Sequence, residues 1–336
     1  MKVLLIYTGG TIGMVQGPEG DLQPFDFAQV LSHVPELAQL QATVETWQPW
    51  EPMDSSEVQP YHWERLAAGI YERRDRYSGF VVLHGTDTMA YTASALSFML
   101  QNLGKPIVFT GSQLPIGVLR SDARENLITS LEVVLQEAND APVLQEVAIY
   151  FEYQLLRANR AYKRSSQAFN AFESPNYPAL GEAGVSLQLH ESSLWRPTGP
   201  VCFAPATDTR VGVLRFFPGM DERLARSICL DSGRDVIILQ SFGSGNAPNW
   251  PWLPTLLDEG QERGVLFINA SQCPMGGVRQ PAYAASRTLR HAGVLSAGDM
   301  TLEAVITKSM WLLGQGKQGV AFREGFATNV AGERSL

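Results

Sequence analysis

The stretch of sequence that decides the fold is Lys2-Val3-Leu4-Leu5-Ile6-Tyr7-Thr8-Gly9-Gly10-Thr11-Ile12-Gly13. It opens with a short apolar run that ends at glycines, which is typical of a buried β-strand followed by a tight turn. In open α/β sheets, ligands bind at the edge where the parallel strands end. The hydroxyl of Thr11 is therefore expected at a ligand-binding edge.

A second apolar run ends in the same way, at Phe80-Val81-Val82-Leu83-His84-Gly85-Thr86-Asp87-Thr88. Because parallel strands end at one common edge, the turns that follow the two runs are expected to lie close together. The chain would then bring two hydroxyls, from Thr11 and Thr86, and the carboxylate of Asp87 to one place.

Strand-like and helix-like runs alternate along the chain, which is the pattern of a parallel sheet covered by helices. Helices are predicted to start near Pro60, just after Asp87, and at Ser121-Asp122, where Glu125 has the spacing of a capping box. The predicted strands are 3–7, 80–84, 106–110, 147–151, 211–216, 235–240 and 264–269.

Residues 190–209 are rich in proline, serine and threonine and show neither helical nor strand periodicity. We interpret 191–210 as a linker between two α/β domains. The predicted domains are a larger catalytic domain at 1–190 and a smaller domain at 211–336.

Composition narrows the class of protein. A chain of 336 residues that is 45% hydrophobic can build two domain cores. The net charge of −8 disfavours nucleic acid as a partner, and no stretch approaches the roughly 20 apolar residues of a membrane span.

The chain begins in a strand rather than in a secretory signal. Three widely spaced cysteines, Cys202, Cys229 and Cys273, favour reduced, largely buried thiols. We therefore expect a cytoplasmic protein.

The two glycine-containing turns also have structural interpretations. The first turn fits neither phosphate-binding fingerprint, so its glycines are explained by the backbone alone or by an active site. Thr86 and Asp87 precede a predicted helix, where both residue types commonly cap the N-terminus. The same N-terminus offers N–H groups to a carboxylate or an oxyanion, and Asp87 suits an ammonium group. These groups together fit a free α-amino acid.

Two more segments carry candidate residues. Asp54-Ser55-Ser56-Glu57 reads alone as a capping loop, but beside an amino-acid site its hydroxyls and amides suit an α-carboxylate. Lys163 follows the strand 147–151 and reads alone as a solvated lysine. The alternative is a partly buried lysine that acts as a base on a threonine hydroxyl.

Other catalytic classes lack their motifs. The five histidines and three cysteines form no zinc-binding pattern, and no Gly-x-Ser-x-Gly elbow is present. We expect neither a metal nor another cofactor, and we expect His84 to be packed at the end of its strand.

The motifs resemble those of the bacterial-type L-asparaginases, and most closely their cytosolic type I branch. The resemblance runs in order over nearly the whole chain. The matching stretches are 7–13, 53–56, 84–90, 109–113, 121–127, 245–248, 271–273 and 291–294.

The resemblance implies a two-domain asparaginase-like fold, with a larger N-terminal α/β domain and a smaller flavodoxin-like α/β domain. It implies metal-free hydrolysis of L-asparagine to L-aspartate and ammonia. Thr11 would be the nucleophile that forms an acyl-enzyme. Thr86, Asp87 and Lys163 would form a second hydroxyl–carboxylate–lysine group, and the N–H of Thr86 would bind the oxyanion.

The resemblance also implies how the substrate is bound. Ser55, with Asp54 and Ser56, would hold the α-carboxylate, and Asp87 would hold the α-ammonium group. A neighbouring subunit would contribute Asn246. The chain is therefore expected to form a homo-oligomer, at least a dimer.

The sequence departs from the family pattern at two places. The loop 14–25 has no tyrosine, which the family usually places near the nucleophile; Phe25 can cover the site but cannot relay a proton. Some cytosolic members are activated by asparagine at a second site that uses an arginine where Gln240 stands, so we expect no such activation here.

Three other functions stay open at this point. A non-catalytic amino-acid sensor of the same fold is suggested by the missing loop tyrosine. An amidase subunit for transfer-RNA amidation is the alternative within the family, although such chains carry an additional N-terminal domain. A nucleotide-binding module is the third. Ammonia release from asparagine would separate an enzyme from a sensor.

Overall fold

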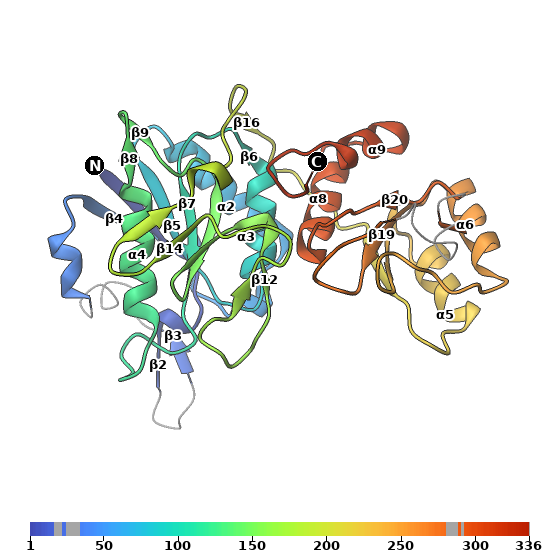
Figure 1. Ribbon diagram of the computed structural model, residues 1–336, viewed down its shortest axis with the longest axis horizontal. Coiled ribbons are helices and arrows are strands. Elements are labelled where there is room, and N and C mark those ends of the chain that lie inside the picture. The colour runs from blue at the N-terminus through green and yellow to red at the C-terminus, as the bar shows by residue number, and fades with distance from the viewer. Residues whose placement is uncertain (17–21, 25–33, 280–287, 290–291, 336) are drawn as a thin grey trace. The chain divides into compact units, whose positions relative to one another are not determined.

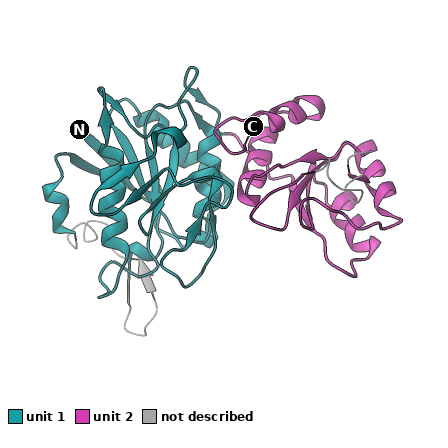
Figure 2. Cartoon of the chain, in the orientation of Figure 1, with its two compact units in different colours: residues 1–205 teal, residues 206–336 magenta. Residues whose placement is uncertain are grey.

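The computed structural model describes residues 1–16, 22–24, 34–279, 288–289 and 292–335. The chain divides into two compact units, Met1–Pro205 and Ala206–Leu336, which Figure 2 draws in different colours. Each unit has its own sheet with helices around it. The expected linker at 191–210 stays a prediction.

The first unit is built on an eight-stranded mixed sheet (Figure 1). Five strands at one side of it are parallel, in the order β10 (Val147–Phe151), β7 (Ile107–Thr110), β5 (Gly79–Leu83), β1 (Lys2–Tyr7) and β4 (Thr43–Trp47). Three antiparallel strands extend the sheet beyond β10: β11 (Gln154–Arg157), β14 (Gly181–Ala183) and β15 (Leu187–Leu189).

The central strand β1 shows why this sheet forms. Every residue from Val3 to Tyr7 is at most 1% exposed, which is the burial of a parallel strand covered on both faces. Val3, Leu5 and Tyr7 share one hydrophobic cluster with the apolar face of α4 (Ala123–Leu135). Among the residues that the structure describes, the other α-helices of this unit are α2 (Pro60–Arg73) and α3 (Met89–Met99).

The helix α4 begins at the predicted place, but the predicted capping box is absent. Asp122 occupies the N-cap and makes no side-chain cap bond. The carboxylate of Glu125 instead accepts hydrogen bonds from Thr129 Oγ1 at 2.9 Å and from the phenol of Tyr150 at 2.5 Å. Because Tyr150 lies on the buried strand β10, its hydroxyl needs an internal acceptor, and this need overrides the local capping pattern.

The hairpin between β10 and β11 is made by a two-residue turn at Glu152 and Tyr153. Their φ values are +46° and +68°, which is the left-handed backbone of a type I′ turn. Such turns favour asparagine and glycine. Here Asn126 Oδ1, on α4, accepts the N–H of Glu152 at 3.1 Å and so supports the turn from outside.

The second unit contains a four-stranded parallel sheet in the order β17 (Val211–Arg215), β18 (Val236–Ser241), β19 (Leu266–Ser271) and β20 (Leu295–Ser296). The α-helices with described bounds in this unit are α5 (Glu222–Arg226), α6 (Leu253–Glu262), α8 (Leu302–Gly314) and α9 (Gly319–Ala327). All seven strands predicted from the sequence are present in the two units, with ends shifted by at most two residues.

Short strand pairs complete the described fold. They are β2 (Met14–Gln16) with β3 (Leu22–Pro24), β6 (Leu100–Gln101) with β16 (Cys202–Phe203), β8 (Glu137–Ala138) with β9 (Ala141–Pro142), and β12 (Tyr162–Lys163) with β13 (Phe172–Glu173).

The cysteines are partly as predicted. All three are free thiols, and Cys229 is buried. The prediction that they are largely buried is wrong for Cys202 and Cys273, which are exposed.

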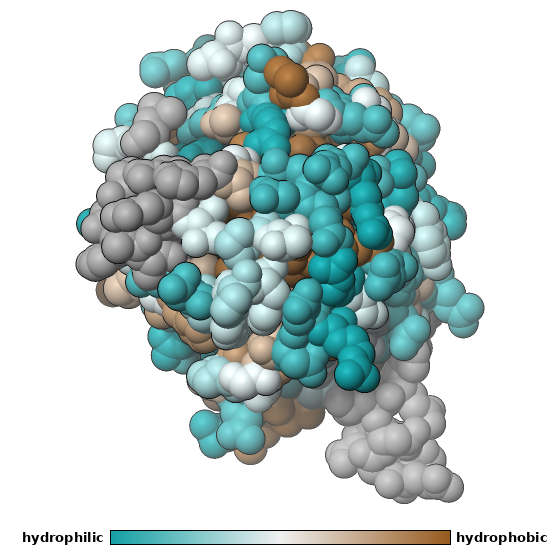
Figure 3. All heavy atoms as spheres, turned by 90° about the vertical axis from the view of Figure 1, so that its right-hand side faces the viewer, coloured by the Kyte–Doolittle hydropathy of each residue, from teal (hydrophilic) through white to brown (hydrophobic). Residues whose placement is uncertain are grey.

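The face shown in Figure 3 is mostly hydrophilic, with hydrophobic residues scattered over it. Within the described ranges, none of the helices has the length and apolar content needed to cross a bilayer.

An ion pair is enclosed in the core of the second unit. The side chains of Lys308 and Glu333 are both 0% exposed, and Lys308 Nζ lies 2.5 Å from Glu333 Oε1. The same ammonium donates to the carbonyls of Phe326 and Thr328, and Glu333 accepts from the N–H of Ala331. Burial lowers the pKa of Lys308, and Glu333 opposes that shift. The pair therefore fastens the segment after α9 to α8.

Removal of one partner is expected to destabilise the protein strongly, because an unpaired charge would stay buried. We predict that Glu333→Gln lowers the free energy of unfolding by about 3–5 kcal/mol in urea titrations. Adding Lys308→Met to that variant should recover much of the loss. The exposed pair Lys2–Glu45 is the control, and Lys2→Met should cost less than about 1 kcal/mol. A Glu333→Gln variant as stable as this control would contradict the prediction.

Candidate active site

The first turn follows directly from the end of β1. Thr8 donates its N–H to Leu83 O at 3.0 Å, so the chain stays beside β5 for one residue past the strand. Gly9 and Gly10 then take φ values of +119° and +90°, which favour glycine over any other residue. Thr11 starts a single 3-10 turn, Thr11–Gly13, and its side chain is partly exposed.

The three candidate turns touch through their backbones. A Cβ placed on Gly10 would lie 2.4 Å from Gly85 N, and a Cβ on Gly9 would lie 2.1 Å from Met53 O. A Cβ on Gly85 would lie 2.6 Å from Ser55 Oγ. These distances are far below van der Waals contact, so a side chain at any of the three glycines would force the turns apart. The turns that carry Thr11, Ser55 and Thr86 are thereby brought together. The sheet edge predicts this for Thr11 and Thr86 but not for Ser55.

A lysine from a distant part of the sequence joins the second turn. Lys163 Nζ lies 2.7 Å from Thr86 Oγ1 and 2.6 Å from Asp87 Oδ1. The Lys163 side chain is 16% exposed, whereas that of Asp87 is 61% exposed. The reading of Lys163 as a solvated lysine is therefore wrong, because two oxygens and the surrounding protein replace most of its water.

The helix-capping interpretation of Thr86 and Asp87 is also wrong. The N-cap of α3 is Thr88, and it makes no side-chain cap bond. Thr86 and Asp87 lie in the turn before the helix, where their oxygens face Lys163 instead of the first turn of the helix.

The capping interpretation of the segment 54–57 is confirmed. Asp54 Oδ1 accepts the N–H of Ser56 at 2.8 Å and caps a 3-10 turn, Ser55–Glu57. Asp54 and Ser56 are exposed, whereas Ser55 is 3% exposed and packs against Gly85. Of the three predicted carboxylate-binding residues, Ser55 is the one enclosed between the turns.

His84 is packed at the end of β5, as predicted, and its hydrogen bonds fix its protonation. Its Nδ1 lies 2.7 Å from Gly85 O, which can only accept, so Nδ1 carries the proton. Its Nε2 lies 3.0 Å from Thr92 Oγ1, which in turn accepts the indole N–H of Trp63 at 3.1 Å. Burial lowers the pKa of His84 to about 4, so the ring is neutral near pH 7. A neutral imidazole thus orients the Gly85–Thr86 peptide.

Tyr7, which was not among the predicted site residues, supports the first turn through a hydrogen bond to its backbone. Its hydroxyl donates to Gly13 O at 3.1 Å, and burial raises its pKa to about 12. An apolar strand pattern gives no sign of this contact. The strands β2 and β3 lie within the segment 14–25, and Phe25 lies outside the described residues.

Asn246 lies in the second unit, in a turn held by its bridge to Phe242. Its Oδ1 is buried and has no hydrogen-bond partner among the residues that the structure describes. A buried amide oxygen without a partner is costly, so this atom has an unused capacity to accept a hydrogen bond.

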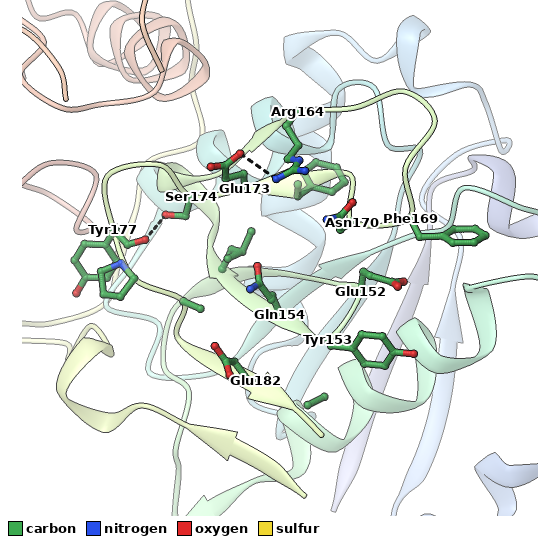
Figure 4. A pocket seen from close by; sticks show the side chains of 15 residues that line it. Glu152, Tyr153, Gln154, Arg164, Phe169, Asn170, Glu173, Ser174, Tyr177 and Glu182 are labelled. Carbon is green, nitrogen blue, oxygen red and sulfur yellow. Dashed lines mark hydrogen bonds and ion pairs between the residues drawn. The ribbon is translucent and has the colours of Figure 1, made fainter. Parts of the chain in front are cut away.

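A separate cavity of about 930 Å³ lies beside the strand pair that carries Lys163 (Figure 4). Glu152, Glu173 and Glu182 line it, and Arg164 pairs with Glu173 at 3.5 Å. None of the predicted site residues lines this cavity, so it is distinct from the cluster around Lys163. In the described part of the chain, no group of three or more histidine, cysteine or carboxylate side chains is placed to hold a metal ion.

Two family models match the chain, one in each unit. The model described as "Asparaginase, N-terminal" matches residues 2–195, and "Glutaminase/Asparaginase C-terminal domain" matches residues 210–326. The chain is 40% identical over 335 residues to L-asparaginase 1 of Escherichia coli strain K12, covering 99% of this chain and 97% of that one.

Solved structures are similar over the whole length. L-asparaginase I from Vibrio cholerae has a TM-score of 0.89 at 37% identity, covering 100% of this chain and 99% of that chain. The thermostable L-asparaginase from Thermococcus kodakarensis has a TM-score of 0.90 at 33% identity, covering 100% of both chains.

The neutral, buried His84 makes a specific prediction about acid stability. The ordinary pKa of histidine is about 6.5, so the unfolded state binds more protons than the folded state between about pH 6.5 and 4. Stability therefore falls as the pH falls through this range. We predict that the loss of unfolding free energy between pH 7 and 4.5 is about 2 kcal/mol smaller in His84→Gln than in the wild type. Parallel losses in the two proteins, measured by urea titration, would show that His84 does not titrate this way.

Proposed function

Because the chain belongs to the asparaginase family, with the fold and amidohydrolase class that the resemblance implied, we propose that Thr11 is the nucleophile with which it hydrolyses L-asparagine to L-aspartate and ammonia. One observation carries this proposal. The Thr11 turn touches Gly85, and the next two residues hold Lys163 by hydrogen bonds of 2.7 and 2.6 Å. The turn that carries Thr11 is thus in contact with the turn that carries the hydroxyl–carboxylate–lysine group.

The polar and charged groups on these turns suit an α-amino acid. The exposed carboxylate of Asp87 can bind the α-ammonium group, because only one of its sides is taken by Lys163. On the neighbouring turn, Ser55 offers a hydroxyl to the α-carboxylate, and Asp54 and Ser56 flank it. Two recognition points on adjacent turns orient the side-chain amide relative to Thr11.

The reaction then proceeds in two displacements. Thr11 Oγ attacks the amide carbon of asparagine, and the N–H of Thr86 stabilises the negative oxygen that forms. The proton of the Thr11 hydroxyl ends on the leaving nitrogen, which departs as ammonia and leaves a β-aspartyl ester. Water next attacks that ester, regenerates the Thr11 hydroxyl and releases aspartate. The ammonium group of Lys163 donates to Thr86 Oγ1, and its positive charge stabilises negative charge that develops near Thr86.

The proposal includes assembly and location. The Oδ1 of Asn246, which is buried and has no hydrogen-bond partner in the described ranges, supports a homo-oligomer in which Asn246 of one chain completes the site of another. Two exposed free thiols, Cys202 and Cys273, support a reducing compartment such as the cytoplasm. Sedimentation of the purified protein tests the first point.

The first experiment measures ammonia released from L-asparagine. We predict that Thr11→Ala lowers kcat by about 10³-fold or more and that Lys163→Met lowers it by about 10²–10⁴-fold. Lys2→Met is the control, because it removes an ammonium with an equally short carboxylate contact on the surface. A Thr11→Ala enzyme with wild-type turnover would exclude the proposed nucleophile, and a wild-type protein that binds aspartate without releasing ammonia would identify a sensor.

Glutamine should be a poor substrate. Its reacting carbon lies one methylene farther from the ammonium and carboxylate groups that Asp87 and Ser55 hold. A misplacement of about 1 Å can cost on the order of 100-fold in rate, so we predict a kcat/KM for glutamine at least about 100-fold below that for asparagine. Equal rates of ammonia release from the two amides would contradict this prediction.

A further inference from the structure

The hydroxyl of Thr88 links two of the three turns of the site. Thr88 Oγ1 lies 2.6 Å from Ser55 O, which is 33 residues earlier in the chain. A carbonyl oxygen can only accept, so the hydroxyl must be the donor. Its one proton is therefore committed to the turn that carries Ser55.

This bond replaces the one that a threonine at this position usually makes. Thr88 is the N-cap of α3, and its side chain makes no cap bond. An N-cap threonine bond typically stabilises the helix that it starts. Thr88 does not contribute this stabilisation to α3. Its hydroxyl instead binds the segment that carries Ser55. Positions that break a local rule in this way are frequent at functional sites.

The bond holds one side of a peptide unit whose other side is also held. The carbonyl of the Ser55–Ser56 peptide accepts from Thr88 and, at 3.2 Å, from the N–H of Val58, and the N–H of this peptide donates to Asp54 Oδ1 at 2.8 Å. Because a peptide unit is planar, these three bonds fix its orientation, and the bond from Thr88 is the one that comes from another segment. Ser55 Oγ packs directly against Gly85, so the serine has little freedom to move.

We propose that Thr88 is a positioning residue that sets the α-carboxylate subsite at a fixed place relative to Asp87. Thr88 follows Asp87 directly in the chain, and its hydroxyl holds the peptide of Ser55. One short segment thus spaces the group that binds the α-ammonium from the group that binds the α-carboxylate. The inference rests on the proposed roles of Ser55 and Asp87, and it makes Thr88 a determinant of selectivity for amino acids that carry both charges on one carbon.

The kinetic test compares replacements that differ in the hydroxyl. Thr88→Val keeps the shape but removes the donor, and we expect it to raise KM for asparagine about 10-fold with kcat changed less than about threefold, because one hydrogen bond that orders the carboxylate subsite is lost. Thr88→Ser restores the donor and should return KM to within about threefold of the wild type. Thr110→Val is the matched control, because Thr110 Oγ1 also donates to a carbonyl of another segment, Tyr150 O at 2.9 Å, and this variant should keep the wild-type KM.

A binding test separates this inference from the proposed function, since it needs no turnover. Calorimetry with L-aspartate should show about 10-fold weaker binding to Thr88→Val than to the wild type. β-Alanine, which is aspartate without its α-carboxylate, should bind both proteins equally. If Thr88→Val loses its fold in thermal melts, Thr88→Ala takes its place in both titrations.

Unchanged aspartate binding in a folded Thr88→Val or Thr88→Ala protein would overturn the inference. Equal weakening of aspartate and β-alanine binding would also overturn it, because the defect would then not lie at the carboxylate subsite. Failure of Thr11→Ala to lose activity would instead overturn the proposed nucleophile and leave the titration result valid.

Discussion

The site depends on the direct backbone contact of three turns at Gly9, Gly10 and Gly85. Each of these glycines faces backbone or side-chain atoms of another turn at a distance that leaves no room for a Cβ. A strand end alone would leave its polar groups several ångströms from those of its neighbours. Because Gly9, Gly10 and Gly85 have no side chains, the segments that carry Thr11, Ser55 and Thr86 pack directly against one another. The proposed reaction requires this close packing of the turns, because the catalytic groups lie on different segments of the chain.

The parallel core of the sheet was predictable because its signal is local. Strands such as β1 are buried on both faces and therefore appear as unbroken apolar runs in the sequence. The antiparallel extension through β11 was not predicted. Its turn at Glu152 and Tyr153 has a left-handed backbone without the usual asparagine or glycine, and it is supported by Asn126 from a distant helix. The residues of the turn itself give no sign of this contact, because Asn126 lies 26 residues away in the chain.

The site was predictable in its members but not in all of its contacts. Turn residues after buried strands identified Thr11, Thr86 and Asp87, because the sheet edge gathers such turns. Residue type alone favoured a solvated Lys163 and a helix cap at Thr86 and Asp87, and both interpretations failed for one reason. The 2.7 and 2.6 Å contacts of Lys163 join residues more than seventy positions apart, and they use the oxygens that a cap would need. Thr88, which the local pattern gives no reason to select, takes the N-cap position without capping.

The unequal exposure of the Lys163–Asp87 pair has a consequence for the surroundings in which the protein works. Lys163 is mostly enclosed, whereas 61% of the Asp87 side chain faces solvent. Dissolved cations reach the carboxylate of the single chain without any change in the structure, and under the role proposed for Asp87 they compete there with the ammonium group of an incoming amino acid. Under that role, the salt concentration influences substrate binding without a dedicated regulatory site, because dissolved ions screen exposed charges.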